Sequence, residues 1–510
     1  MYNSIHAYGM EVNEMDEKDK RIKELEQQVA ELNERIAFLT SKLFGKKTEK
    51  THCLPEDDRQ LDLFHLEERN EELENSREIS VKSHTKKIRS SSRNIDISNI
   101  PVEIVNHMMP EEKCSCPECH THLVQVANPK IREEVKFVPA RLKLIEHHQA
   151  VYKCPKCSSS DHSEISKAPM PRSLITHSKV GSPSIVAHIA AMKYVYKVPC
   201  YRQESMWKLR GLPLTRQQMS KWMIDVFNNQ LLPLYDLLLS ELKTQRFLHV
   251  DETPYNTLAS EKSKTYYWVA TSGKFEKRNI AVFTHSDGRS SETARKLLGD
   301  FKGYIQTDGY AGYNFLDRTR HLGCLAHVRR YFIDSLKNSS FKESKSFSGE
   351  IVKDIDEIFE LERNISDKFN DDERLKYRRE ILLPLMKRVF SKISSVTASV
   401  KSSLGKARNY ALSHERNILN IFEKGYLELS NNSAERAVKE SVMGRKNWLF
   451  SSTFEGAQAN AVALSLIYTA KLNHLDPEEY LRKVLTEITS IEIFDSEMFR
   501  KFLPWNIDLT

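Results

Sequence analysis

The sequence predicts a multidomain α/β protein. A chain of 510 residues exceeds one ordinary domain, so we expect a core of roughly 200 residues or more together with smaller modules. Strand and helix signals alternate between residues 245 and 475, as expected for a mixed α/β core. A heptad-like stripe near the N-terminus and two closely spaced cysteine pairs mark modules that precede this core.

The charge and hydropathy of the chain exclude some classes of protein. A formal charge of +7 and a pI near 8.7 describe a mildly basic protein, which is compatible with a nucleic-acid partner. The best apolar run, Ala461 to Ala470, is too short to span a membrane, and the N-terminus lacks the pattern of a secretory signal. We therefore expect a soluble cytosolic protein that does not engage a membrane.

Residues 15–50 carry apolar side chains at alternating steps of three and four, with polar residues between them. The members of this stripe are Ile22, Leu25, Val29, Leu32, Ile36, Leu39 and Leu43. Such a seam is typical of a coiled coil, which would join two copies of the chain into a homo-oligomer. The alternative is one amphipathic helix folded back on its own chain. Residues 51–100 change from acidic to basic and serine-rich, and we interpret them as a linker.

Two Cys-Pro-x-Cys pairs lie in residues 101–165, at Cys116 and Cys119 and again at Cys154 and Cys157. This two-residue gap lets both thiolates of a pair reach one tetrahedral ion, so the two pairs form a complete ligand set. Residues between the pairs alternate apolar and polar side chains as a β-hairpin does. The segment therefore predicts a zinc-ribbon-like module with a structural Zn²⁺, and bound zinc would contribute to its folding.

Residues 176–240 are predicted to be helical, with a turn near Gly211 and a second helix capped at Thr215. This arrangement resembles a helix-turn-helix, in which residues at the start of the second helix contact DNA. Those residues are Arg216, Gln217, Gln218 and Lys221. A plain helical hairpin that serves only as scaffold is an equally good interpretation.

Three acidic residues of the core, Asp251, Asp308 and Glu435, form the candidate catalytic set. Asp251 and Asp308 each close a predicted strand, and Glu435 lies in the first turns of a predicted helix. Between the two aspartates the predicted order is three strands, a helix and a strand, which matches an RNase H-like topology. Carboxylates that converge in this way can hold two Mg²⁺ ions, or Mn²⁺, for phosphodiester chemistry. Residues 338–425 are predicted to be a helical insertion and residues 476–510 a C-terminal helical segment.

Basic residues and a histidine flank these acids. They are His327, Arg329 and Arg330 after the fifth strand, and Arg436, Lys439, Arg445 and Lys446 around Glu435. We expect them to contact DNA phosphates near the metal ions. The alternatives are solvated helix charges and, for His327, a structural histidine.

Several strings along the chain resemble a known family. HVDETPY, TDGYAGYN, GCLAHVRR and NNSAERAVKESVMGRKNWLFSS are similar to those of the insertion sequence 66 family of bacterial DDE transposases, and the likeness extends over nearly the whole chain. The resemblance implies that Asp251, Asp308 and Glu435 are the catalytic metal ligands. It also implies an N-terminal zipper-like helix, a zinc-finger-like module, and small accessory proteins as possible partners. By the same resemblance, we expect a cytoplasmic bacterial protein that associates with the nucleoid when bound to DNA.

We therefore expect a transposase that binds the terminal repeats of an insertion sequence and catalyses Mg²⁺-dependent strand cleavage and strand transfer. One alternative is a catalytically inactive, zinc-containing DNA-binding protein derived from a transposase. A stand-alone nuclease with the same fold is another, although it would leave the additional modules unexplained.

Overall fold

The computed structural model describes residues 78–81, 84–87, 142–153 and 165–509, apart from residues 177, 179, 263, 300, 337–345 and 492–496. The chain divides into two compact units, one formed by residues 45–143 and the other by the remainder. The predicted coiled coil and the four zinc-site cysteines lie outside the described residues. Inside the predicted linker, β1 (Glu78–Val81) and β2 (His84–Lys87) pair as an antiparallel ribbon.

A five-stranded mixed sheet forms the centre of the larger unit, with strand order β7-β6-β5-β8-β9. The first three strands, β5 (Phe247–Tyr255), β6 (Thr265–Ser272) and β7 (Ala281–Ser286), pair antiparallel in sequence order. The helix α7 (Ser291–Leu298) then leads to β8 (Tyr304–Gln306), which returns to pair parallel with β5. Next to β8 lies β9 (His321–Leu322), also parallel. The predicted order of strands and helix between Asp251 and Asp308 is therefore present.

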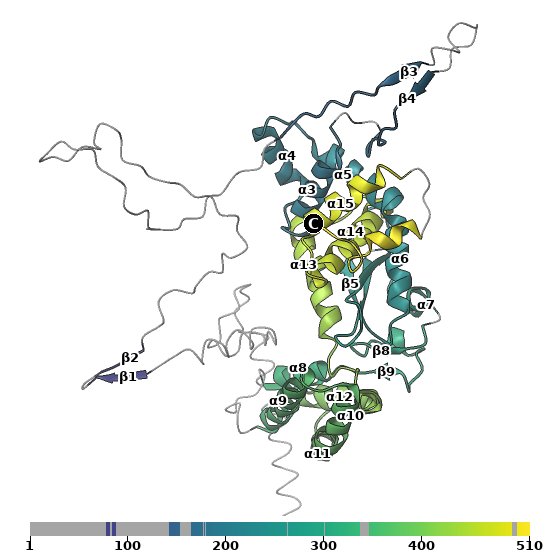
Figure 1. Cartoon of the computed structure of the whole chain (residues 1–510). Coiled ribbons are helices and arrows are strands. Elements are labelled where there is room, and N and C mark those ends of the chain that lie inside the picture. The colour runs from purple at the N-terminus through teal and green to yellow at the C-terminus, as the bar shows by residue number, and fades with distance from the viewer. Residues whose placement is uncertain are drawn as a thin grey trace, which may run out of the picture. The chain divides into compact units, whose positions relative to one another are not determined.

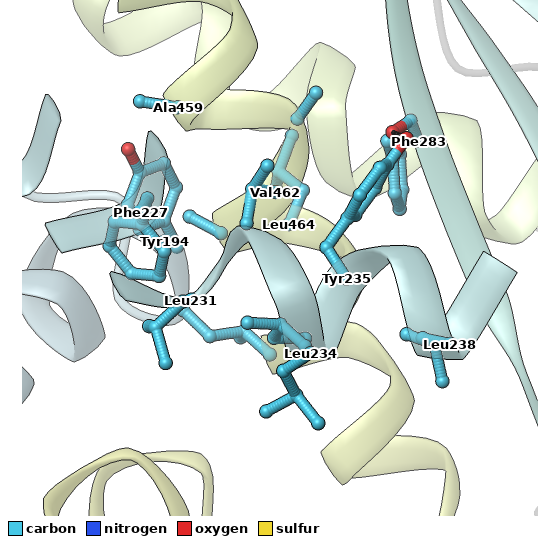
Figure 2. Close-up of a cluster of buried hydrophobic side chains, with 14 of the residues drawn as sticks. Tyr194, Phe227, Leu231, Leu234, Tyr235, Leu238, Phe283, Ala459, Val462 and Leu464 are labelled. Atoms are coloured by element: carbon cyan, nitrogen blue, oxygen red, sulfur yellow. Dashed lines mark hydrogen bonds between the residues drawn. The ribbon is translucent and has the colours of Figure 1, made fainter. Parts of the chain in front are cut away.

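Helices from both ends of this unit pack around the sheet (Figure 1). The helix α13 (Asn432–Trp448) contacts β5 and β6, and α14 (Phe454–Leu472) contacts β7. Because α14 is buried on nearly every side, its sequence is apolar almost throughout. Figure 2 shows part of this core, where Val462 and Leu464 of α14 lie near Phe227, Leu234 and Phe283.

The helices before the sheet and the helix after α14 complete this core. They are α3 (Pro183–Tyr194), α4 (Cys200–Leu209), α5 (Arg216–Asp225), the π-helix η4 (Val226–Gln230), α6 (Leu232–Lys243) and α15 (Pro477–Ile488). The helix α15 packs mainly on α3, so the C-terminal segment closes against the segment that precedes the sheet. Tyr480 of α15 donates to the carbonyl of Phe502, which fixes the short 3₁₀ helix η9 (Met498–Phe502) beneath it.

A helical insertion separates β9 from α13 and has a hydrophobic core of its own. It follows α8 (Leu325–Leu336) and comprises α9 (Phe347–Ser366), α10 (Asp371–Tyr377), the π-helix η7 (Arg378–Leu382), α11 (Leu383–Ser395), α12 (Ser403–Leu419) and the 3₁₀ turn η8 (Asn420–Glu423). Because α8 packs on both α9 and α12, it connects the sheet to the insertion.

The described residues include a hairpin near the second cysteine pair. Within the described residues, β3 (Val151–Lys153) pairs with the downstream β4 (Ile165–Lys167) rather than with the segment before it. In sequence, this hairpin therefore encloses the second cysteine pair, while most of the segment between the two pairs lies outside the described residues. None of the helices in the described part of the chain is long and apolar enough to cross a membrane.

Candidate active site

An open pocket of about 320 Å³ lies where β5, the loop after β8 and α13 approach one another. The carboxylates of Asp251, Asp308 and Glu435 all line it. The structure thus brings together the three acids that the sequence places far apart. The other lining residues are His327, Arg330, Val438, Lys439 and Val442.

The sequence suggested that Asp251 ends its strand, but β5 continues to Tyr255. The two edges of β5 differ in how far they are paired. On one side β6 pairs with β5 from Leu248 to Tyr255, whereas on the other side β8 pairs only with Phe247 to His249. Asp251 therefore lies just past the end of the parallel pairing, which leaves room for a pocket beside it.

Asp308 follows β8 and is held by a tight turn. Its Oδ1 accepts a hydrogen bond from the backbone N–H of Tyr310 at 2.9 Å. Between them Gly309 has a φ of +91°, a backbone conformation that side chains with a Cβ rarely adopt. The sharp exit predicted from the Asp-Gly sequence is therefore present, and it turns the Asp308 carboxylate toward the pocket.

Glu435 lies in the first turn of α13, and the residue before this helix connects it to β5. Asn431 does not cap the helix with its side chain. Instead its Nδ2 donates to the carbonyl of Val250 at 3.0 Å, and its Oδ1 faces His249 Nδ1 at 3.2 Å. His249 Nε2 lies 2.8 Å from Glu428 Oε1, so both ring nitrogens face oxygen atoms. Despite its burial, Glu428 has a lowered pKa because His249 stabilises its carboxylate.

Arg330 and His327, both on α8, contact the Glu435 carboxylate. Arg330 Nη2 donates to Glu435 Oε2 at 3.0 Å, and Arg330 Nη1 lies 3.1 Å from His327 Nε2. A guanidinium can only donate, so His327 Nε2 accepts and the ring proton resides on Nδ1. That nitrogen faces Glu435 Oε1 at 3.6 Å, too far for a hydrogen bond. Burial lowers the pKa of His327, in keeping with a neutral ring.

The thiol of Cys324 lies close to His327 and Glu435. The Sγ of Cys324, one ring nitrogen of His327 and an oxygen of Glu435 all lie within 4.8 Å of one another. However, the Cys324 sulfur already accepts the backbone N–H of Asn431 at 3.2 Å. Because His327 Nε2 is occupied by Arg330 and the ring proton lies on Nδ1, neither ring nitrogen is free to bind an ion, and this trio is better explained as part of the support of Glu435.

The pocket concentrates negative charge around Asp251. Burial raises the pKa of the Asp251 carboxyl well above its usual value, and the neighbouring carboxylates of Asp308, Glu252 and Glu435 raise it further. Buried in the pocket wall, Glu435 Oε1 has no hydrogen-bond partner. A cluster of carboxylates with an unpartnered oxygen is a set of hard ligands suited to divalent cations.

Glu252, next to Asp251, is a residue of the site that sequence reasoning missed. Its buried carboxylate accepts a hydrogen bond from Tyr313 at 2.6 Å and pairs with Arg289. The Arg289 guanidinium lies 3.6 Å from the ring centroid of Tyr310, two residues after Asp308. This chain of contacts connects the strand of Asp251 to the loop of Asp308. The only sequence signal was the acidic residue following Asp251, which alternation sends to the opposite face of the strand.

The basic residues expected to contact DNA differ in their exposure and in their distance from the pocket. Arg330 and Lys439 line the pocket, and Arg436 and Lys446 are exposed on α13. Arg445 is half-buried and donates to the carbonyl of Pro254. Arg329 is the exception, because it is 7% exposed and pairs with Asp356 of α9, with Nη2 to Oδ2 at 3.0 Å. The expectation that Arg329 contacts DNA is therefore replaced by a structural role between α8 and the insertion.

The predicted second helix of the helix-turn-helix-like segment is α5, capped by Thr215 as expected. Arg216, Gln217 and Lys221 are exposed on it, while Met219 and Trp222 of the opposite face are buried. Gln218 is also exposed, but its side chain is engaged in the helix cap, where Oε1 accepts the backbone N–H of Thr215 at 3.0 Å. Gln218 is consequently less free than its neighbours to contact a ligand.

Comparison with known proteins identifies the class and the family of the chain. The model described as "Transposase IS66 family" matches residues 179–459, which is more than half of the chain and includes the pocket described above. Two further models match, namely the "zinc-finger binding domain of transposase IS66" at residues 113–158 and the "IS66 C-terminal element" at residues 465–505. The protein belongs to the IS66 transposase family, as its sequence motifs had indicated.

The curated relatives carry little functional description. The chain is 27% identical to the uncharacterized protein y4jD of Sinorhizobium fredii over 95% of this chain and 96% of that protein. It is likewise 27% identical to the uncharacterized protein y4hP of the same organism, over 94% of this chain and 88% of that protein. The similarity thus extends over most of the length of both relatives and is not confined to one segment of the chain.

Proposed function

We propose that this chain is a DDE transposase with an RNase H-like core, in which Asp251, Asp308 and Glu435 are the catalytic acids. The observation that carries the proposal is that three carboxylates from separate segments line one open pocket. Two basic side chains, Arg330 and Lys439, line the same pocket. In this pocket, acidic side chains that can bind metal ions lie beside basic side chains that can bind phosphates. Phosphodiester chemistry requires both kinds of group.

Magnesium is the cofactor that suits these residues. The three carboxylates offer only oxygen ligands, and Glu435 Oε1 is buried without a hydrogen-bond partner. A bound pair of ions would supply activation of the attacking hydroxyl and charge stabilisation at the leaving oxygen. The three acids would hold these ions, and Mn²⁺ could replace Mg²⁺ because both prefer oxygen ligands.

The neighbouring side chains of the chain orient the DNA. Arg330 is half-exposed and can transfer a hydrogen bond from Glu435 to a phosphate oxygen. Lys439, one helical turn after Glu435, is exposed and can neutralise a second phosphate. Since the same pocket can admit water or a DNA 3′-hydroxyl as nucleophile, cleavage and strand transfer need no separate site.

Other segments would recognise the ends of the element. The zinc-finger module with Cys116, Cys119, Cys154 and Cys157 and the exposed start of α5 are the candidate DNA-binding elements. The stripe of residues 15–50 would join copies of the chain, so that both ends are held in one assembly. This division assigns recognition to the N-terminal half of the chain and chemistry to the core of residues 245–475.

The test is a cleavage assay with the full-length protein, Mg²⁺ and labelled DNA carrying the terminal sequence of the element. Asp251→Asn should reduce cleavage by more than about one hundred-fold, since even outer-shell partners of a metal usually contribute ten- to one-hundredfold. Glu292→Gln, an exposed acid on α7, is the control and should retain activity. Specific binding without cleavage by the unmodified protein would favour the inactive DNA-binding alternative, and cleavage that Asp251→Asn leaves intact would refute this assignment.

A further inference from the structure

Three aromatic rings stack in a row that begins at the loop carrying Asp308. The ring of His414 lies on that of Tyr410 with centroids 4.3 Å apart and planes inclined by 30°. Tyr410 in turn stacks on Tyr331 at 4.4 Å and 25°. Two of these rings belong to α12 of the helical insertion and the third to α8, so the row also joins these two helices.

The inner end of the row is fixed to the catalytic loop. A Cβ added to Gly309 would lie 2.5 Å from His414 Nε2, so this ring occupies the space that the glycine leaves empty. The hydroxyl of Tyr410 donates to the backbone carbonyl of Asp308 at 2.5 Å. Hence the position of the rings is coupled directly to the backbone of a proposed catalytic acid.

The outer end of the row is open. Tyr331 is 39% exposed although one face of its ring is covered by Tyr410. On α8 it directly follows Arg330 and lies one turn after His327, and both of these residues line the pocket. An acidic neighbour, Asp334, is exposed one turn further along α8, away from the pocket end of the helix. Tyr331 is therefore next in the chain to Arg330, the side chain proposed to hold a phosphate, and within about one helical turn of the pocket residues of α8.

We propose that the exposed face of Tyr331 is a stacking site for an unpaired DNA base next to the phosphate that is cut. The inference rests on the proposed function, because it requires DNA in the pocket. An aromatic face accepts any base without reading its sequence, and stacking is stronger when the ring is already held rigid. The row supplies that rigidity, since Tyr331 is supported by Tyr410, and Tyr410 by His414 and the Asp308 carbonyl.

A site of this kind would also help to separate the DNA strands at the end of the element. Unpairing a base is energetically unfavourable, and an aromatic face that receives the base offsets part of this cost. The ring row would thereby keep the scissile strand in the pocket while its complement moves away. The competing explanation is that the three rings serve only to pack α12 against the catalytic loop.

Binding measurements on matched DNAs distinguish these explanations. Short duplexes carrying the element end are prepared with single abasic sites at successive positions beside the cleavage point, and Kd is measured for the full-length protein in the presence of Ca²⁺. With intact DNA, Tyr331→Ala should weaken binding by about five- to one-hundredfold, the range reported for loss of one base–aromatic stack. With the abasic site at the stacked position the variant and the unmodified protein should bind equally, whereas Tyr331→Phe should behave as the unmodified protein on every DNA.

Phe369→Ala is the matched control, because Phe369 is an aromatic residue of the insertion with a similar exposure of 37%. The effect of Phe369→Ala on Kd should be the same for intact and for abasic DNA. Should Tyr331→Ala fail to fold, 5-iodouracil placed at the same positions of the DNA and irradiated with the unmodified protein provides a second measurement, with the crosslink expected on Tyr331.

Two results would overturn the inference. One is an effect of Tyr331→Ala that is equal on intact and abasic DNA at every position, which would indicate packing alone, and the other is a crosslink map without Tyr331. Neither result would affect Mg²⁺-dependent cleavage that requires Asp251. Loss of the proposed function itself would appear separately, as absence of cleavage by the unmodified protein.

Discussion

A single residue, Asn431, connects the strand of Asp251 to the helix of Glu435. Replacing it with alanine leaves His249 Nδ1 and the Val250 carbonyl without their partner in a buried position. Each orphaned group costs about 1–3 kcal/mol, so we expect Asn431→Ala to lower the free energy of unfolding by about 2–6 kcal/mol. Urea unfolding followed by tryptophan fluorescence measures the difference.

The adjacent Asn432 provides the control for this residue. It is half-buried at the start of α13, and Asn432→Ala should change the free energy of unfolding by less than about 0.5 kcal/mol. Equal losses for the two variants would contradict the specific role given to Asn431. DNA cleavage should follow the same order, because of these two asparagines it is Asn431 whose side chain donates to β5.

At this scale the sequence could indicate Asp251, Asp308 and Glu435, because the order of strands and helices around them restricts where they can meet. It could not indicate Asn431, Arg289 or the burial of Arg329. Each of these depends on a partner in a distant segment, such as Asp356 for Arg329, and local periodicity contains no information about such pairs.

At the scale of elements, α14 protects the free edge of the sheet. The outermost strand β7 has β6 on one side only. On the other side, Ser465 Oγ accepts the backbone N–H of Phe283 at 2.8 Å, and Thr469 Oγ1 accepts that of Ala281 at 3.1 Å. These hydroxyls are one helical turn apart and accept hydrogen bonds from alternate residues of β7. Side chains of a helix therefore provide the acceptors that a neighbouring strand would otherwise supply.

This contact predicts the effect of removing the hydroxyls with little change of shape. Ser465→Ala and Thr469→Val should each lower the free energy of unfolding by about 1–3 kcal/mol, because a buried N–H loses its acceptor. The control is Ser413→Ala on α12, which removes an exposed hydroxyl that bonds only within its own helix region and should be nearly neutral. If the substitutions on α14 are equally neutral in urea unfolding, then water satisfies the edge of β7 and the proposed protection is wrong.

Element boundaries show why prediction from sequence was incomplete. The apolar run Phe247–Val250 defined the start of β5, but its extension to Tyr255 depends on pairing with β6, which continues after the pairing with β8 has ended. The pairing of β3 with β4 likewise depends on a partner beyond the second cysteine pair. Helix types and order were predictable from periodicity, whereas strand lengths required knowledge of the neighbouring strand.

At the scale of the whole molecule, the catalytic core should be independent of zinc. Its two hydrophobic clusters consist of residues from Leu174 onward, beyond the segment matched by the zinc-finger model. All five tryptophans also lie in this part, namely Trp207, Trp222, Trp268, Trp448 and Trp505. Tryptophan fluorescence therefore reports the unfolding of the core and not of the zinc module.

The double variant Cys116→Ser/Cys119→Ser removes half of the predicted thiolate ligands. We expect it to lose its zinc, measured by atomic absorption, and to bind element-end DNA at least about ten-fold more weakly, because a small zinc module folds only with its metal. Its thermal unfolding followed by tryptophan fluorescence should nevertheless match that of the unmodified protein, since the core is not held together by this ion. Cys53→Ser, which changes a cysteine outside the two pairs, should retain both zinc and DNA binding. A core transition several degrees lower in the double variant would instead mean that the module and the core fold as one cooperative unit.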